Sequence, residues 1–130
     1  MTGSHDPVWL PKEVILRVHD RQIEIHGGLA GVRDEGLLES ALARPLNAWS
    51  YGETDICFLA ALYGKGIIGN HPFADGNKRS GLVAIELFLE LNGYSLVADD
   101  DNVLATILSV AAGDMSEEEL AAWLRENTER

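Results

Sequence analysis

Apolar residues recur at helical spacing along most of this chain. In the first segment, Val14, Ile15 and Val18 fall on one face of a helix. The pair Gly27–Gly28 follows, and glycine commonly ends a helix because it adopts the left-handed backbone conformation at little cost. The pattern therefore predicts a first helix that ends near His26.

The next segment carries a start signal, an apolar stripe and a stop signal. Asp34 can cap a helix over residues 34–43, with its side chain accepting a hydrogen bond from a backbone N–H group. Pro45 is expected to end that helix, since proline has no N–H group to donate and clashes with the preceding turn. Residues 46–54 show no helical period, and we expect them to form a short irregular or extended flap.

Two later stretches are apolar on almost every face, which is typical of central, buried helices. They cover residues 55–70 and residues 79–92. Gly93 supplies a stop for the second stretch, and residues 94–97 are suited to a short extended piece. We expect these two helices to form the centre of the core.

The last part of the chain predicts two more helices. One covers residues 103–112. The other starts with a capping box, in which Ser116 and Glu119 satisfy each other's backbone N–H groups. No internal repeat or linker interrupts the sequence. We therefore predict a single all-α domain over residues 1–130, with about six helices and with residues 1–6 as a loose tail.

Composition and charge narrow the functional classes. An apolar fraction of 46% is ample for the core of a domain of 130 residues. The net charge of −11 argues against direct nucleic-acid binding and favours basic partners. The single cysteine, Cys57, excludes an internal disulfide. No apolar run approaches the ~20 residues of a membrane span, and the polar start does not resemble a signal peptide, so we expect a cytoplasmic protein without membrane contact.

The run HPFADGNKR, which begins at His71, concentrates the candidate chemistry. Gly76 allows a sharp turn into an apolar helix, whose first backbone N–H groups and dipole favour an anion such as a phosphate. Lys78 and Arg79 add positive charge at the same place. Asp75 can hold a divalent cation on the phosphates, and His71 is a candidate general base, the role that histidine fills most often among side chains. Together these residues predict a site for phosphate chemistry.

The same run resembles the signature of the Fic/Doc family, H-x-F-x-[DE]-[GA]-N-[GK]-R. Lys78 and Leu82 are similar to the death-on-curing (Doc) branch, because Fic proteins usually carry Gly and Arg at these two places. The resemblance extends over nearly the full chain, including residues 27–31, 34–45 and 92–94. It implies a compact Fic/Doc-like helical bundle and, for function, the toxin of a type II toxin–antitoxin system.

By that resemblance, a Doc-like protein transfers the γ-phosphate of ATP, bound with Mg²⁺, to a Ser or Thr hydroxyl of elongation factor Tu and so blocks translation. His71 would take the hydroxyl proton, and Asp75 would hold Mg²⁺. Lys78 is implied to disfavour the nucleotide pose that leads to AMP transfer in Fic proteins, so a protein kinase is favoured over a nucleotidyltransferase. The phosphate contacts would come from Gly76, Asn77, Lys78 and Arg79.

The resemblance also implies a regulator. Toxins of this family are inhibited by a cognate antitoxin whose C-terminal segment folds on binding. Fic proteins that regulate themselves carry an inhibitory [ST]-x-x-x-E-[GN] helix, and this motif does not occur in the sequence. An antitoxin that acts in trans is therefore expected, and the charge of −11 predicts that it is rich in Lys or Arg.

Three other functions remain alternatives. AMP transfer at the same site is the first, and a nucleotide- or protein-binding module without turnover is the second. A metal hydrolase is the third, but it needs ligands beyond His71 and Asp75. The candidates by residue type are His19, His26 and Asp20, and the two histidines lie one heptad apart on the first helix.

Three cations outside the motif are further candidates for contacts with a ligand or substrate. Lys65 would extend the cationic island formed by Lys78 and Arg79. Arg33 and Arg44 flank the second predicted helix, where they would either contact a protein substrate or pair with nearby glutamates.

Overall fold

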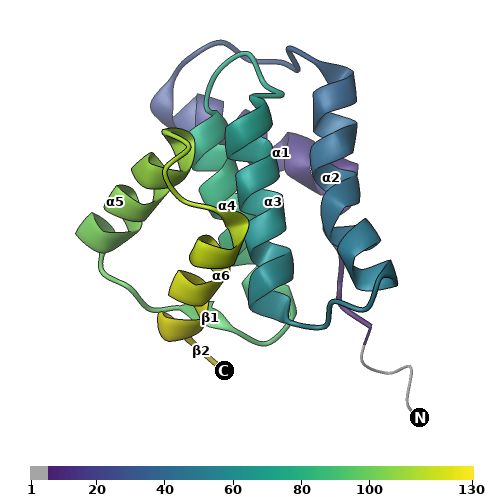
Figure 1. The fold of residues 1–130 in the computed structure, drawn as a ribbon. Coiled ribbons are helices and arrows are strands. Elements are labelled where there is room, and N and C mark those ends of the chain that lie inside the picture. The colour runs from purple at the N-terminus through teal and green to yellow at the C-terminus, as the bar shows by residue number, and fades with distance from the viewer. Residues whose placement is uncertain (1–5) are drawn as a thin grey trace.

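Two apolar helices, α3 (Ile56–Asn70) and α4 (Asn77–Leu91), form the centre of the fold (Figure 1). The computed structural model describes residues 6–130. The predicted loose tail therefore lies outside the described residues, except for Asp6, which is exposed. Although α3 is apolar on every side, no helix in the described range is long and apolar enough to cross a membrane.

Glycines at the contact between α3 and α4 allow these helices to pack closely. A Cβ atom on Gly81 would lie 2.5 Å from Ile68 Cγ1, and a Cβ atom on Gly64 would overlap the side chain of Ile85. Side chains that meet at less than van der Waals distance force the neighbours to shift, which costs stability in a packed core. The two helices that carry the ends of the motif turn are thus held at short range.

Four further helices and a small sheet surround this pair (Figure 1). The helices are α1 (Lys12–His26), α2 (Glu35–Ser50), α5 (Asp100–Ala111) and α6 (Glu117–Glu126). α2 and α6 pack on α3, and α1 packs on α4. β1 (Ser95–Leu96) pairs antiparallel with β2 (Thr128–Glu129), which ties the end of the chain to the segment after α4. The prediction of an all-α fold with about six helices is confirmed for residues 6–130.

α2 does not stop at Pro45, as the sequence predicts, but continues to Ser50. The irregular or extended flap predicted for residues 46–54 is therefore wrong over residues 46–50, which are helical, and only residues 51–54 are irregular. Pro45 is buried at helical spacing from Leu38 and Ala41. The fixed φ of proline fits a helix, and burial of this face offsets the hydrogen bond that proline cannot donate.

The predicted helix starts have the contacts expected of them. Asp34 accepts a hydrogen bond from a backbone N–H group of α2, at 3.0 Å. Ser116 and Glu119 form the predicted capping box of α6. Asp55 and Asp99 cap α3 and α5 in the same manner. Side-chain oxygens thus satisfy backbone donors at the start of four helices, whereas α1 and α4 begin without a side-chain cap.

Candidate active site

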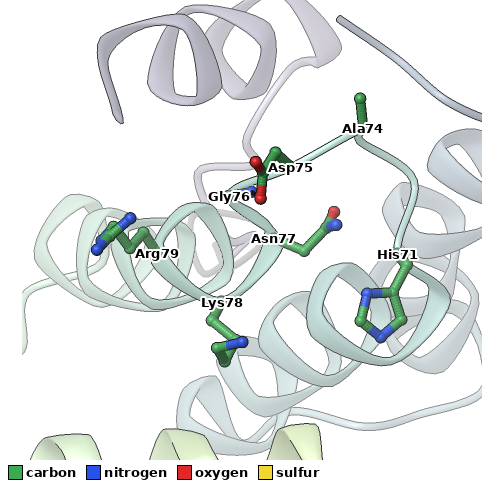
Figure 2. Close-up of a pocket in the computed structure, with 7 residues that line it drawn as sticks. All are labelled: His71, Ala74, Asp75, Gly76, Asn77, Lys78 and Arg79. Carbon is green, nitrogen blue, oxygen red and sulfur yellow. Dashed lines mark hydrogen bonds between the residues drawn. The ribbon is translucent and has the colours of Figure 1, made fainter. Parts of the chain in front are cut away.

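The turn between α3 and α4 lines a pocket of about 310 Å³. Figure 2 shows His71 at one side of this pocket and Arg79 at the opposite side, with Asp75 and Lys78 between them. One turn of chain therefore gathers a base, a carboxylate and two cations around the same space. The lining residues are His71, Ala74, Asp75, Gly76, Asn77, Lys78 and Arg79.

α4 begins without a side-chain cap. Gly76 occupies the N-cap position in the left-handed conformation, with φ 75° and ψ 19°, which glycine tolerates best. The first backbone hydrogen bond of the helix runs from Ser80 N–H to Gly76 O, at 3.0 Å. The N–H groups of residues 77–79 precede this bond and form the positive end of the helix dipole. Uncapped N–H groups of this kind bind phosphate or carboxylate groups.

His71 ends α3 in an atypical backbone conformation. Its φ of 51° and ψ of 54° are left-handed, and among residues 6–130 it is the only residue other than glycine with a positive φ. A side chain in this region costs about 1–2 kcal/mol. Pro72 follows, and the residue before a proline favours extended backbone. The imidazole is exposed and has no hydrogen-bond partner within the described residues, so the backbone determines where this base lies.

The segment between α1 and α2 runs beside the motif turn and holds it in place. Ala74 N–H donates to Gly31 O at 3.0 Å, and an isolated antiparallel β-bridge joins the same two segments. The backbone N–H groups of Arg33 and Asp34 both donate to Pro72 O, at 2.7 and 3.0 Å. The sequence predicts only the end of α1 in this segment, so its contact with the motif turn is a finding of the structure.

α1 supports the motif turn from the inside of the fold. His19 is buried, with 1% of its surface exposed, and its ring stacks on Phe73 with the two centroids 3.8 Å apart. His19 Nε2–H donates to the backbone oxygen of Asp75 at 2.8 Å. His19 is therefore an anchor for the loop. The available sequence signal was its position four residues after Ile15, on the buried face of the helix.

Asp75 has the donor chemistry that Mg²⁺ takes. Its Oδ1 accepts from the N–H of Gly76 at 3.1 Å, and its Oδ2 accepts from the N–H of Leu29 at 3.4 Å. These two bonds orient the carboxylate, which stays exposed at the pocket and keeps lone pairs for a cation. One carboxylate suits Mg²⁺ when phosphate oxygens complete the coordination. Gly28 is needed beside it, because a Cβ atom there would lie 2.8 Å from Asp75 Oδ2.

Asn77 is buried and braces the motif turn. Its Nδ2 donates to the backbone oxygen of Phe73 at 3.1 Å, and its Oδ1 accepts from the N–H of Phe73 at 3.0 Å. The second Nδ2 hydrogen and the backbone N–H of Asn77 are left as donors for a phosphate. The phosphate contact of Asn77 stays a prediction, and its bracing role is one that the sequence did not indicate.

Lys78 and Arg79 are exposed and form no ion pair within residues 6–130. They make a local cationic island on a chain whose net charge is −11. Lys65, predicted as a third member, is not part of it, because its Nζ donates to Met115 O at 2.6 Å and it does not line the pocket. Arg44 pairs with a glutamate of α6, which is the second of the two roles predicted for it.

Comparison with known proteins decides the family. The model of the Fic/DOC family matches residues 9–89. The chain belongs to the Fic/DOC family. The matched range runs from α1 through nearly all of α4, so it contains the pocket and every segment that holds the motif turn.

Two Doc proteins are similar to this Fic/DOC chain over most of its length. Protein kinase doc of Escherichia phage P1 is 33% identical over 114 residues, which cover 87% of this chain and 90% of the relative. Toxin Doc of Mycolicibacterium smegmatis is 41% identical over 103 residues, which cover 75% of this chain and 78% of the relative. The predicted likeness to the Doc branch is confirmed.

The ligands of the alternative metal hydrolase do not come together in this Fic/DOC fold. His19 donates to the backbone beneath the motif turn, and His26 is exposed at the end of α1. In the described part of the chain, no group of three or more His, Cys, Asp or Glu side chains is placed to hold a metal ion. The Mg²⁺ role predicted for Asp75 is a different case, because it would rely on one carboxylate together with phosphate oxygens.

Proposed function

We propose that this Fic/DOC chain is a Doc-type toxin that transfers the γ-phosphate of ATP to a Ser or Thr hydroxyl of a protein. The observation that carries the proposal is the pocket itself, in which an exposed base at His71 faces the uncapped start of α4 with Lys78 and Arg79. The kinase named among its relatives supports the same reaction. The family resemblance favours elongation factor Tu as the target protein.

The reaction needs one proton acceptor and one path for the phosphoryl group. His71 accepts the proton of the incoming hydroxyl while the hydroxyl oxygen forms a bond to the γ-phosphorus. The bond from that phosphorus to the β,γ-bridging oxygen breaks, and ADP leaves with the electron pair. A positioned general base contributes roughly 10²–10⁴ in rate.

Electrostatic stabilisation and positioning carry most of phosphoryl transfer. Lys78 and Arg79 lie where they can neutralise charge on the transferred group, and the N–H groups of residues 77–79 add fixed donors. Asp75 would hold Mg²⁺, which supplies positive charge to the phosphate oxygens. Lys78 is the residue to which we assign the choice of γ-phosphate over AMP, since its long cationic side chain occupies pocket space and alters the local field.

An antitoxin that acts in trans completes the proposed function. A mostly apolar groove of about 390 Å³ adjoins the pocket through Lys78 and Arg79 and is otherwise lined by α4 and α5. Leu104 and Leu108 are exposed there, at 58% and 49%. Such a groove suits the apolar face of a helical segment that folds on binding. An inert purified chain with its motif intact would contradict this part of the proposal.

The test is a pair of labelling reactions. The purified chain is mixed with Mg²⁺, bacterial lysate and ATP that carries the label at either the γ- or the α-phosphate. His71→Ala is the control for the base, and chelation of Mg²⁺ is the control for Asp75. We expect label on a protein from the γ position only. Label from the α position only would mean AMP transfer, and no label with elongation factor Tu present would favour a binding module without turnover.

A further inference from the structure

The side chain of Arg33 binds the last carbonyl groups of α3. Its Nε donates to His71 O at 2.8 Å, and its Nη2 donates to His71 O at 2.5 Å and to Asn70 O at 3.1 Å. Carbonyl groups at a helix C-terminus lack partners within the helix and carry the negative end of its dipole. Charge-assisted hydrogen bonds of this kind are roughly twice as strong as neutral ones.

These bonds fix the peptide on which His71 depends. Its left-handed backbone is disfavoured for a residue with a side chain, so surrounding contacts must maintain it. The Arg33 side chain donates hydrogen bonds to the His71 carbonyl group. The backbone N–H groups of Arg33 and Asp34 donate to the next carbonyl group, on Pro72. Because the imidazole has no hydrogen-bond partner in the described part of the chain, the direction of this base follows from the carbonyl clamp.

Of the two roles that the sequence suggests for Arg33, contact with a protein substrate stays a prediction, and pairing with a glutamate is not observed in the described residues. Within residues 6–130 it forms no ion pair with an acidic side chain. It does not line the pocket of the motif turn either. All of its observed hydrogen bonds go to the backbone that carries the base.

We propose that Arg33 is a positioning residue for His71. Its hydrogen bonds to the Asn70 and His71 carbonyl groups hold the His71 backbone in the left-handed conformation, and this conformation determines where the imidazole lies. The inference rests on the proposed transfer reaction. A misplacement of about 1 Å in a catalytic group costs on the order of 10²-fold in rate. Nucleotide binding should be unaffected, because the hydrogen bonds of Arg33 go to Asn70, His71 and Pro72 and not to Asp75, Lys78 or the start of α4.

The first experiment compares Arg33→Met with Arg33→Lys and with a matched control, Arg21→Met. Arg21 loses the same charge from an exposed position on α1, where it makes only a 4.0 Å pair with Glu24. We expect Arg33→Met to lower kcat for label transfer by about 10²-fold and to leave the KM for ATP unchanged. Arg33→Lys keeps one donor and should restore part of kcat, since lysine cannot make the forked contact.

Two kinetic outcomes would overturn the proposal. One is wild-type kcat in Arg33→Met, or an equal loss in Arg21→Met. The other is a rise in KM for ATP at unchanged kcat, which would assign Arg33 to nucleotide binding. Thermal melting checks that each variant is folded, and if Arg33→Met does not fold, the partial loss expected of Arg33→Lys is the test.

A second measurement does not depend on activity. The chain has a mass of 14.2 kDa, which is suitable for backbone NMR, and the HN–Hα coupling and Cα shift of His71 report its φ. We expect left-handed values in the wild type, in Arg33→Lys and in Arg21→Met, and a departure from them in Arg33→Met. If His71 kept its left-handed φ in Arg33→Met, Arg33 would not be what maintains this backbone conformation. If the wild type transfers no label, the proposed function fails, and this measurement still decides the role of Arg33.

Discussion

The starts of α4 and α6 solve the same problem in opposite ways. At α6, Glu119 N–H donates to Ser116 Oγ at 3.1 Å, and Ser116 N–H donates back to Glu119 Oε1 at 2.9 Å. At α4, Gly76 offers no side chain, and the first N–H groups of the helix have no cap. One helix satisfies its own donors, and the other leaves them open. α1 also begins without a side-chain cap, so the start of α4 is distinguished by the pocket and by Lys78 and Arg79 beside it.

Helix ends show the same contrast. α1 ends at Gly27 with φ 80° and ψ 179°, a positive-φ conformation that glycine adopts without strain. α3 ends at His71 with φ 51° and ψ 54°, so there a residue with a side chain must adopt a positive φ. The structure therefore gives up stability at both ends of the motif turn, at the two positions where the proposed chemistry needs a base and an anion site.

The largest expected effect is the loss of label transfer when His71 is replaced, and the choice of replacement also tests the backbone strain at this position. His71→Ala and His71→Gly should both lower label transfer by roughly 10²–10⁴. They should differ in stability, because glycine accepts the left-handed conformation and alanine does not; we expect His71→Gly to be more stable by about 1 kcal/mol. Urea unfolding measures the difference. Equal stability of the two variants would contradict the strain assigned to His71.

A second prediction separates the packing of α3 on α4 from the pocket. Gly64→Ala should destabilise the fold by about 1–3 kcal/mol, because its Cβ would overlap Ile85. Gly69→Ala is the matched control in the same helix, since a Cβ there meets nothing within 4 Å, and it should stabilise by about 0.5–1 kcal/mol. Thermal melting of the pair is the measurement. Equal shifts in both variants would count against close packing at Gly64.

A third prediction concerns the capped helix. Ser116→Ala should cost about 1 kcal/mol of stability and leave label transfer unchanged, because the capping box lies outside the pocket. The hydrogen bond from the Ser116 backbone, and then that from its side chain, lower the pKa of Glu119 below its usual value. A lowered pKa gives stability that is present above the unfolded value and is lost as pH falls. The difference between the variant and the wild type should therefore shrink in acid, as unfolding at several pH values will test.

The smallest effect should come from Glu86, on the half-buried face of α4 towards α5. Burial, followed by the charges of Glu90 and Asp100, raises the pKa of Glu86 above its usual value. A raised pKa gives stability that is present at low pH and is lost as pH rises through it. Glu86→Gln should therefore stabilise at neutral pH, by about 0.2–0.5 kcal/mol, and should give no gain in acid. Glu24→Gln, at an exposed position, is the control. An equal gain of stability in that variant would contradict burial and neighbouring charge as the cause of the effect at Glu86.

The sequence predicted what depends on neighbouring residues and missed what depends on distant ones. The capping box of α6 is a local pattern over four positions, and the structure contains it. The long run of α2 was missed because proline was given more weight than the helical spacing of Leu38, Ala41 and Pro45. Tertiary burial outweighed a local stop signal there.

The same distinction holds at the site. The motif residues were recognisable because they are consecutive, and the structure gathers them around one pocket. The supports of the motif turn come from elsewhere: His19 lies 56 residues before Asp75, and Arg33 lies 38 residues before His71. Nothing in the local sequence of either residue indicates such a contact. For His19, the helical spacing indicated a buried position but did not indicate that its partner is the backbone of Asp75.

The most direct test of the contrast between α4 and α6 is an NMR titration of the chain with ATP and Mg²⁺. We expect the amide signals of residues 76–79 to shift strongly and those of residues 117–119 to stay in place, and we expect Asp75→Asn to weaken the response. Unchanged signals at residues 76–79, or shifts of equal size at the start of α6, would contradict the claim that α4 leaves its N-terminus open for the phosphates of a nucleotide.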